Sequence, residues 1–139
     1  MSARTTIAFV GLATLACGVL GLFYPERVMG FVGFAPVSPA QAAGALGETR
    51  ALYGGLLTVL GSATLWAATD PQGHRGTLFL IGLLWLGVFL GRMLGASIDG
   101  NPGLFGWLGG ALEATAASVV LVAPYIGADG EPVAAPPAG

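Results

Sequence analysis

The residues of this chain whose types could do chemistry are four charged side chains set among apolar neighbours. The stretch "GETRALYGG" places Glu48 and Arg50 ahead of an uncharged run that ends at Thr69, and Arg92 and Glu113 interrupt two later apolar runs. Guanidinium and carboxylate groups in such surroundings can pair with each other, hold an anionic group or carry a proton. Which of these they do depends on the elements that position them.

Composition indicates that most of the surface of the folded chain faces lipid. Of the 139 residues, 55% are hydrophobic and only 9% are charged, and the mean hydropathy is +0.80. Soluble domains carry about a quarter charged residues, and a chain this short leaves much of its surface exposed after folding. The sequence therefore predicts an all-α integral membrane protein. β-Barrel strands would need alternating segments of about ten residues, whereas these apolar runs are continuous.

Four segments are long enough to cross a hydrocarbon core, which takes about 20 residues. We expect residues 1–127 to form one four-transmembrane-helix bundle, with helices at about 5–24, 43–69, 76–98 and 103–127. Between the first two, "ERVMGFVGF" predicts a short interfacial helix with one apolar face, formed by Val28, Phe31 and Val32. Residues 128–139 are rich in Pro and Ala, which is typical of a disordered tail.

The arginines outside the apolar runs favour one orientation. Four spans put both termini on one side, together with Arg4 and Arg75, while Arg27 is the basic loop residue opposite. Because positive loop residues favour the cytoplasmic side, we expect both termini to be cytoplasmic.

The expected topology gathers the four intramembrane charges in the outer half of the bilayer. Arg92 precedes the turn at Asp99 by seven residues, or roughly 10 Å, and Glu113 lies about 15 Å into the last span. A charge at the bilayer centre costs at least about 2.5–3.5 kcal/mol, so such residues face inward and pair. We therefore predict a direct ion pair between Arg92 and Glu113, on consecutive antiparallel helices.

The other two charges are expected to reach separate helices. Glu48 and Arg50 point about 200° apart on one helix, so they cannot easily pair with each other. Tyr53 lies one turn after Arg50 and can add a hydroxyl group on the same face. The predicted polar cluster comprises Glu48, Arg50, Tyr53, Arg92, Asp99 and Glu113.

Small residues recur every four positions and predict close helix packing. The predicted packing positions are Gly54 and Gly55 on the second span, Gly87, Gly91 and Gly95 on the third, and Gly106 and Gly110 on the fourth.

The motif "ETRALYGG", followed by "GRMLGASIDGNPG" and an acidic residue in the last span, resembles the bacterial membrane family catalogued as domain of unknown function 4345. The resemblance covers nearly all of the chain except the tail. It implies a small four-helix protein of the bacterial inner membrane, and it supplies no activity.

Catalysis and cofactor binding have little support in the sequence. The single histidine, His74, lies in a turn on the other side of the predicted membrane from the carboxylates, so neither a hydrolytic triad nor a haem site is expected. No Cys/His cluster could hold a metal, and no basic run suits nucleic acid. We predict a protein that is not an enzyme and that binds no cofactor.

Two functions then remain open. In the first, the protein is a structural or accessory bundle with an internal Arg/Glu network, surrounded by membrane lipids and in contact with other membrane subunits or further copies of itself. In the second, the same charges line a binding or transporter-like pocket for a lipid headgroup or small amphiphile in the outer half of the bilayer. Arg50 or Arg92 would then hold an anionic group.

Overall fold

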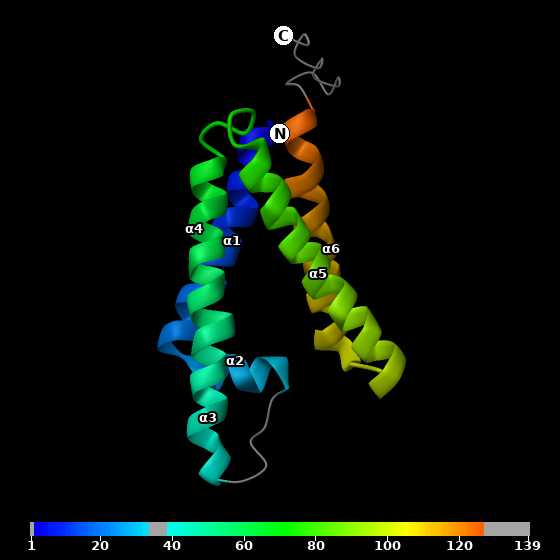
Figure 1. The fold of residues 1–139 in the computed structure, drawn as a ribbon. Coiled ribbons are helices and arrows are strands. Elements are labelled where there is room, and N and C mark those ends of the chain that lie inside the picture. Colours follow the sequence, from blue (N-terminus) through cyan, green and yellow to red (C-terminus); the bar gives the residue numbers. More distant parts are fainter. Residues whose placement is uncertain (1, 34–38, 127–139) are drawn as a thin grey trace.

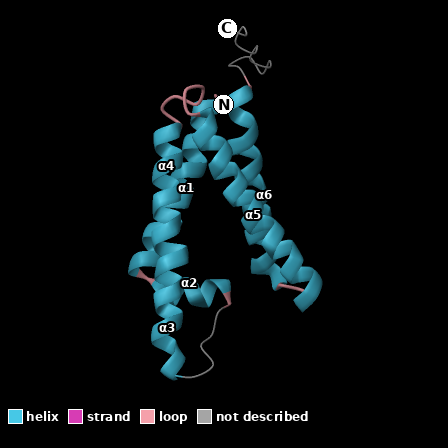
Figure 2. Ribbon diagram, viewed as in Figure 1, coloured by secondary structure: helices cyan, strands magenta, loops and turns pink. Residues whose placement is uncertain are grey.

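The computed structural model describes residues 2–33 and 39–126, and every element in these ranges is helical (Figure 2). The predicted tail, residues 128–139, lies outside the described residues. The elements are α1 (Ala3–Phe23), α2 (Pro25–Val32), α3 (Pro39–Thr49), the π-helix η1 (Arg50–Leu56), α4 (Leu57–Ala67), α5 (Arg75–Asp99), α6 (Gly103–Val122) and the 3₁₀ turn η2 (Ala123–Tyr125).

Within the described residues, three helices are long and apolar enough to cross a membrane, namely Ala3–Phe23, Arg75–Asp99 and Gly103–Tyr125. They correspond to the first, third and fourth predicted spans. Most of their large apolar side chains are exposed, among them Phe9, Leu84 and Leu112. Exposed apolar side chains on all sides of a helix are typical of contact with lipid.

The second predicted span is not one continuous α-helix. Helix begins at Pro39 rather than near Ala43, and the segment is divided into α3, η1 and α4. Neither α3 nor α4 alone, at 11 residues each, is long enough to cross a membrane. The π-helix contains the pair Gly54–Gly55, and glycine is the weakest helix former after proline.

Local sequence explains where the helices begin and end. Ser2 caps α1, because its hydroxyl oxygen accepts a hydrogen bond from the Thr5 amide at 3.2 Å. Pro25 ends α1 at the preceding turn and opens α2, which stops at Gly33 in the left-handed region (φ 81°). Between α5 and α6, the Asn101 Oδ1 atom accepts hydrogen bonds from the Gly103 amide and the Trp107 indole, both at 3.0 Å.

The helices form two antiparallel pairs that meet at one end (Figure 1). One pair is α1 with η1 and α4, and the other is α5 with α6. The buried core lies where the pairs meet, and its fully buried side chains include Ile7 of α1, Leu78 of α5 and Val120 of α6. From this end the pairs diverge, and α2 crosses from one pair toward the other (Figure 1).

A contact between aromatic rings connects the pairs at the divergent end. Phe31 of α2 and Phe105 of α6 have ring centroids 4.8 Å apart at an interplanar angle of 55°, a favourable tilted geometry. The predicted short helix is therefore present, and its Phe31 contacts the opposite pair. Pro25 and Met29 are the buried residues of α2.

Glycines hold the first pair together along the length of α1. A Cβ atom added at Gly11 would lie 2.9 Å from the Leu65 backbone nitrogen, and one added at Gly18 would overlap the backbone of Thr58. At Gly21 it would overlap Tyr53. Because lipid gives helices no hydrophobic reason to associate, such close backbone approach supplies van der Waals packing instead.

Candidate functional site

An ion pair between Arg92 of α5 and Glu113 of α6 is the centre of the candidate site. Arg92 Nε donates a hydrogen bond to Glu113 Oε2 at 2.9 Å, and Arg92 Nη2 donates a second to Glu113 Oε1. The two parallel bonds form the bidentate arrangement that a guanidinium group makes with a carboxylate. The Glu113 side chain is 9% exposed and that of Arg92 is 29% exposed. Both carboxylate oxygens are therefore occupied.

Two adjacent glycines of α6 make room for the Arg92 side chain. A Cβ atom at Gly109 would lie 3.2 Å from Arg92 Cζ, and one at Gly110 would lie 3.3 Å from Arg92 Cδ. The aliphatic stem and the guanidinium plane thus rest on the α6 backbone, where larger residues would push them away. Gly110 was among the predicted packing positions, whereas Gly109 was not.

Tyr53 of η1, in the other helix pair, lies close enough to Arg92 for an electrostatic interaction. It is half-buried, and it follows Arg50 in the motif "RALYGG". The structure therefore relates three members of the predicted cluster to one another, and they come from η1, α5 and α6.

The remaining members of the predicted cluster lie elsewhere. Glu48, Arg50 and Asp99 are exposed, and no ion pair connects them to another residue in the ranges 2–33 and 39–126. Gly21, in the last turn of α1, lies against Tyr53 and Gly54. The chain before Arg50 consequently extends past the end of α1, as Figure 1 shows for α3. The structure therefore does not bring Glu48 or Arg50 into contact with the Arg92–Glu113 pair, and their place in an intramembrane network stays a prediction.

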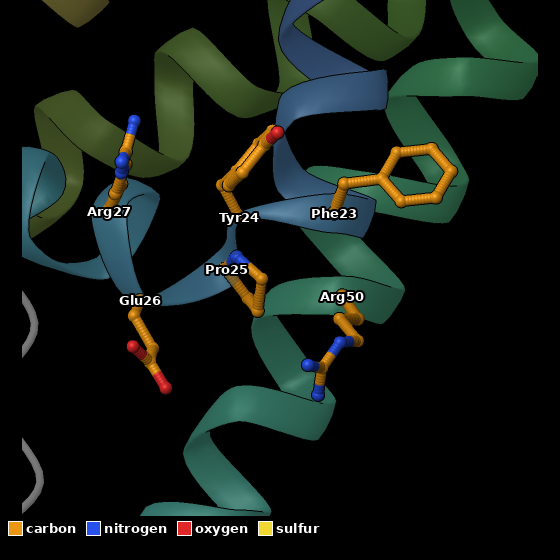
Figure 3. A pocket seen from close by; sticks show the side chains of 6 residues that line it. All are labelled: Phe23, Tyr24, Pro25, Glu26, Arg27 and Arg50. Carbon is orange, nitrogen blue, oxygen red and sulfur yellow. The ribbon is translucent and has the colours of Figure 1, made fainter.

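Arg50 instead lines a surface pocket of about 310 Å³ at the corner between α1 and α2. Its neighbours in the pocket are Phe23, Tyr24, Pro25, Glu26 and Arg27 (Figure 3). Arg27 lies over the Tyr24 ring, with its Cζ atom 5.2 Å from the ring centroid. Arg50 and Arg27 could not be assigned to one pocket from the sequence, because 22 intervening residues separate them and their placement depends on how far α3 and η1 extend.

The predicted packing glycines divide into two groups. Gly54 contacts Leu22 of α1, and Gly110 contacts α5 through Arg92. A Cβ atom at Gly87 or Gly91 would meet nothing within 4 Å, and one at Gly95 would meet only Asp99 of its own helix. Neither Gly55 nor Gly106 meets a neighbouring helix at its Cβ position. The α5 glycine face, defined as Gly87, Gly91 and Gly95, is thus not used for packing within the described chain.

The strongest glycine seam was not predicted. It consists of Gly11, Gly18 and Gly21 on α1. These residues face Gly54 of η1 and Gly61 of α4. A signal was available, because Gly11 and Gly18 are seven residues apart and Gly21 follows three residues later, which places all three on one helix face.

Comparison with known proteins identifies a family and no relative of known activity. No curated protein and no solved structure matches the chain. The model of one protein family, described as "Domain of unknown function (DUF4345)", matches residues 2–123. The matched range includes all the helices described above except part of η2. The chain therefore belongs to the DUF4345 family.

Proposed function

We propose that this protein is a structural or accessory bundle of the bacterial inner membrane, in which the Arg92–Glu113 pair fastens α5 to α6. The bidentate geometry of that pair is the observation that carries the proposal. A catalytic or transport site needs a group that can bind or release a substrate or proton. Here the two charges satisfy each other and the glycines of α6 cover the guanidinium group.

In this proposal the chain crosses the membrane four times. Helix α1 is long enough to span, and η1 with α4 packs against it from Gly21 to Gly11. A segment that follows a spanning helix over that length crosses the same layer, so η1 and α4 together supply the fourth span. Helix α2 then lies at the membrane surface, and α3 projects beyond it.

The orientation needs a measurement that is independent of arginine counting. Arg50 and Arg27 line the same pocket at one end of the molecule, so two arginines at that end now match Arg4 and Arg75 at the other. Cytoplasmic termini remain part of the proposal, and cysteine labelling of the loops can assign the side on which the termini lie.

The accessory role implies partners within the membrane. The exposed apolar side chains of α5 and α6 contact lipid, and the α5 glycine face suits close approach of another helix. That helix belongs either to a second copy or to another membrane subunit, and native mass spectrometry of the purified protein distinguishes the two.

Exchanging the two charges tests the structural role of the pair. Arg92→Gln or Glu113→Gln leaves one charge buried without its partner, which costs up to about 3–5 kcal/mol. The double variant Arg92→Glu/Glu113→Arg restores a pair of opposite charges. We expect each single variant to unfold at a lower temperature in detergent, and the exchanged protein to recover a substantial part of the loss.

An exchanged protein no more stable than the single variants would contradict a structural role. So would an exchanged protein that folds normally but no longer gains stability from an added lipid that stabilises the wild type, because that result would assign the pair to a ligand site. Glu48→Gln is the matched control, since this exposed carboxylate belongs to no ion pair in the described chain.

A further inference from the structure

The pocket at the corner of α1 and α2 combines an apolar wall with side chains of both charges. Phe23 and Pro25 supply the apolar part, and Glu26, Arg27 and Arg50 supply the charges. The pocket volume of about 310 Å³ falls at the lower end of the range of small-molecule sites. It therefore suits part of an amphiphile rather than a whole large ligand.

The charged side chains are arranged in two directions (Figure 3). Glu26 and Arg50 extend the same way on either side of Pro25, and Arg27 extends the opposite way beside the Tyr24 ring. Glu26 and Arg50 come from α2 and η1, are both exposed, and form no salt bridge with each other. One side of the pocket thus offers an anion and a cation to the same ligand.

The position of the pocket indicates a ligand that belongs to the membrane surface. It lies directly after the last apolar turn of α1, the helix that is long enough to span. Phe23 and Tyr24, at its edge, are 72% and 51% exposed, and aromatic side chains concentrate at the boundary between hydrocarbon and headgroups. The charges of the pocket therefore lie at headgroup depth.

We propose that this pocket binds the headgroup of phosphatidylethanolamine. The Arg50 guanidinium group binds the lipid phosphate, for which its planar donors are suited. The Glu26 carboxylate accepts hydrogen bonds from the primary ammonium group, and Phe23 and Pro25 contact the glycerol and upper acyl carbons. Phosphatidylcholine has no N–H group to donate to Glu26, and phosphatidylglycerol has no cation.

This inference does not depend on the accessory role proposed above, because the Arg92–Glu113 pair takes no part in it. The test uses the purified full-length protein with added dioleoyl lipids that differ only in headgroup. Thermal unfolding and native mass spectrometry report binding of the ethanolamine, choline and glycerol forms. We expect the wild type to bind the ethanolamine lipid about tenfold more tightly than the choline lipid, since one hydrogen bond to a charged group distinguishes them.

Variants of Glu26 and Arg50 separate the roles of these two charges in lipid binding. Glu26→Gln should reduce the preference for ethanolamine over choline several-fold, because a neutral amide oxygen is a weaker acceptor for an ammonium group than a carboxylate. Arg50→Gln should weaken binding of all three lipids. Arg50→Lys keeps the positive charge without the bidentate geometry and should give an intermediate loss. Glu48→Gln, two residues before Arg50 and outside the pocket, should behave as the wild type.

Four results would overturn the proposal. Equal binding of the ethanolamine and choline lipids by the wild type would remove the role of Glu26, and so would an unchanged preference in Glu26→Gln. Tighter binding of the glycerol lipid would indicate a simple anion site. Soluble phosphoethanolamine that displaces the lipid at equal concentration would identify a free metabolite, rather than a lipid, as the ligand.

Discussion

At the scale of single residues, two sets of opposite charges differ in their surroundings, one forming an ion pair between helices and the other lining a surface pocket. Arg92 and Glu113 share two hydrogen bonds between α5 and α6, whereas Glu26 and Arg50 line an open pocket without contacting each other. A mutually satisfied pair fixes helix register, and an unsatisfied pair remains available to a ligand. Arg92 and Glu113 can pair because they lie on the consecutive helices α5 and α6, which pack against each other. Glu26 and Arg50 lie on α2 and η1, which are not consecutive.

The fit of Arg92 against α6 predicts a sharp size limit at Gly109. In Gly109→Val the branched side chain would occupy the space of the guanidinium group, which lies 3.2 Å from a Cβ atom at this position. We expect a loss of about 1–3 kcal/mol in the free energy of unfolding, the usual cost of overpacking. Gly87→Val is the control, because a Cβ atom there meets nothing within 4 Å. Equal unfolding temperatures for the two variants would show that Arg92 does not rest on α6.

At the scale of elements, the molecule depends on two seams with different chemistry. The α1–α4 seam is made by glycines whose backbones approach closely, and the α5–α6 seam contains the ion pair. The π-helix η1 lies at the lower end of the first seam and carries both Tyr53, near Arg92, and Arg50, in the pocket. π-Helical turns occur frequently at functional sites. Here the π-helix contributes one residue to the ion-pair site and one to the pocket.

The glycine seam predicts a strong asymmetry between two Gly→Ala substitutions. Gly18→Ala would place a methyl group into the backbone of Thr58, so α1 and α4 would have to separate. We expect it to lower the free energy of unfolding by about 1–3 kcal/mol. Gly44→Ala in α3 adds the same methyl group where nothing lies within 4 Å, and alanine favours helix. Equilibrium unfolding in detergent compares the two, and a neutral Gly18→Ala would rule out close contact at this seam.

The sequence predicted the elements whose apolar runs are long and continuous in helix, and it also predicted the pairing of Arg92 with Glu113. Both predictions depend on short-range information, because continuous apolar runs give helices and consecutive helices are neighbours. The break of the second segment at the π-helix Arg50–Leu56 was missed. Gly54 and Gly55 were interpreted as packing positions, although glycine also weakens an α-helix. The exposure of Glu48 and Arg50 could not be predicted either, because it depends on how far this segment extends past the end of α1.

At the scale of the whole molecule, two helix pairs share a core at one end and diverge toward the other (Figure 1). The shared end also contains polar contacts between segments distant in sequence, since Gln72 Nε2 donates a hydrogen bond to the Pro124 carbonyl at 2.6 Å. Arg75 lies over the Tyr125 ring at 5.1 Å. The proposed lipid pocket lies at the divergent end, beside α2. The two ends therefore differ in packing, since one holds the buried core and the other carries the surface pocket.

Whether this arrangement spans the membrane four times is the claim on which the proposals depend, and cysteine labelling tests it most directly. In a Cys17→Ala background, single cysteines replace Gln41 in α3, Gly73 in the turn between α4 and α5, or Asn101 in the turn between α5 and α6. We expect an impermeant maleimide added to intact spheroplasts to label the cysteines at positions 41 and 101. The cysteine at position 73 should react only after permeabilisation. The reverse pattern would keep four spans and invert the orientation. If positions 41 and 73 were labelled from one side of the membrane and position 101 from the other, the four-span account would be contradicted.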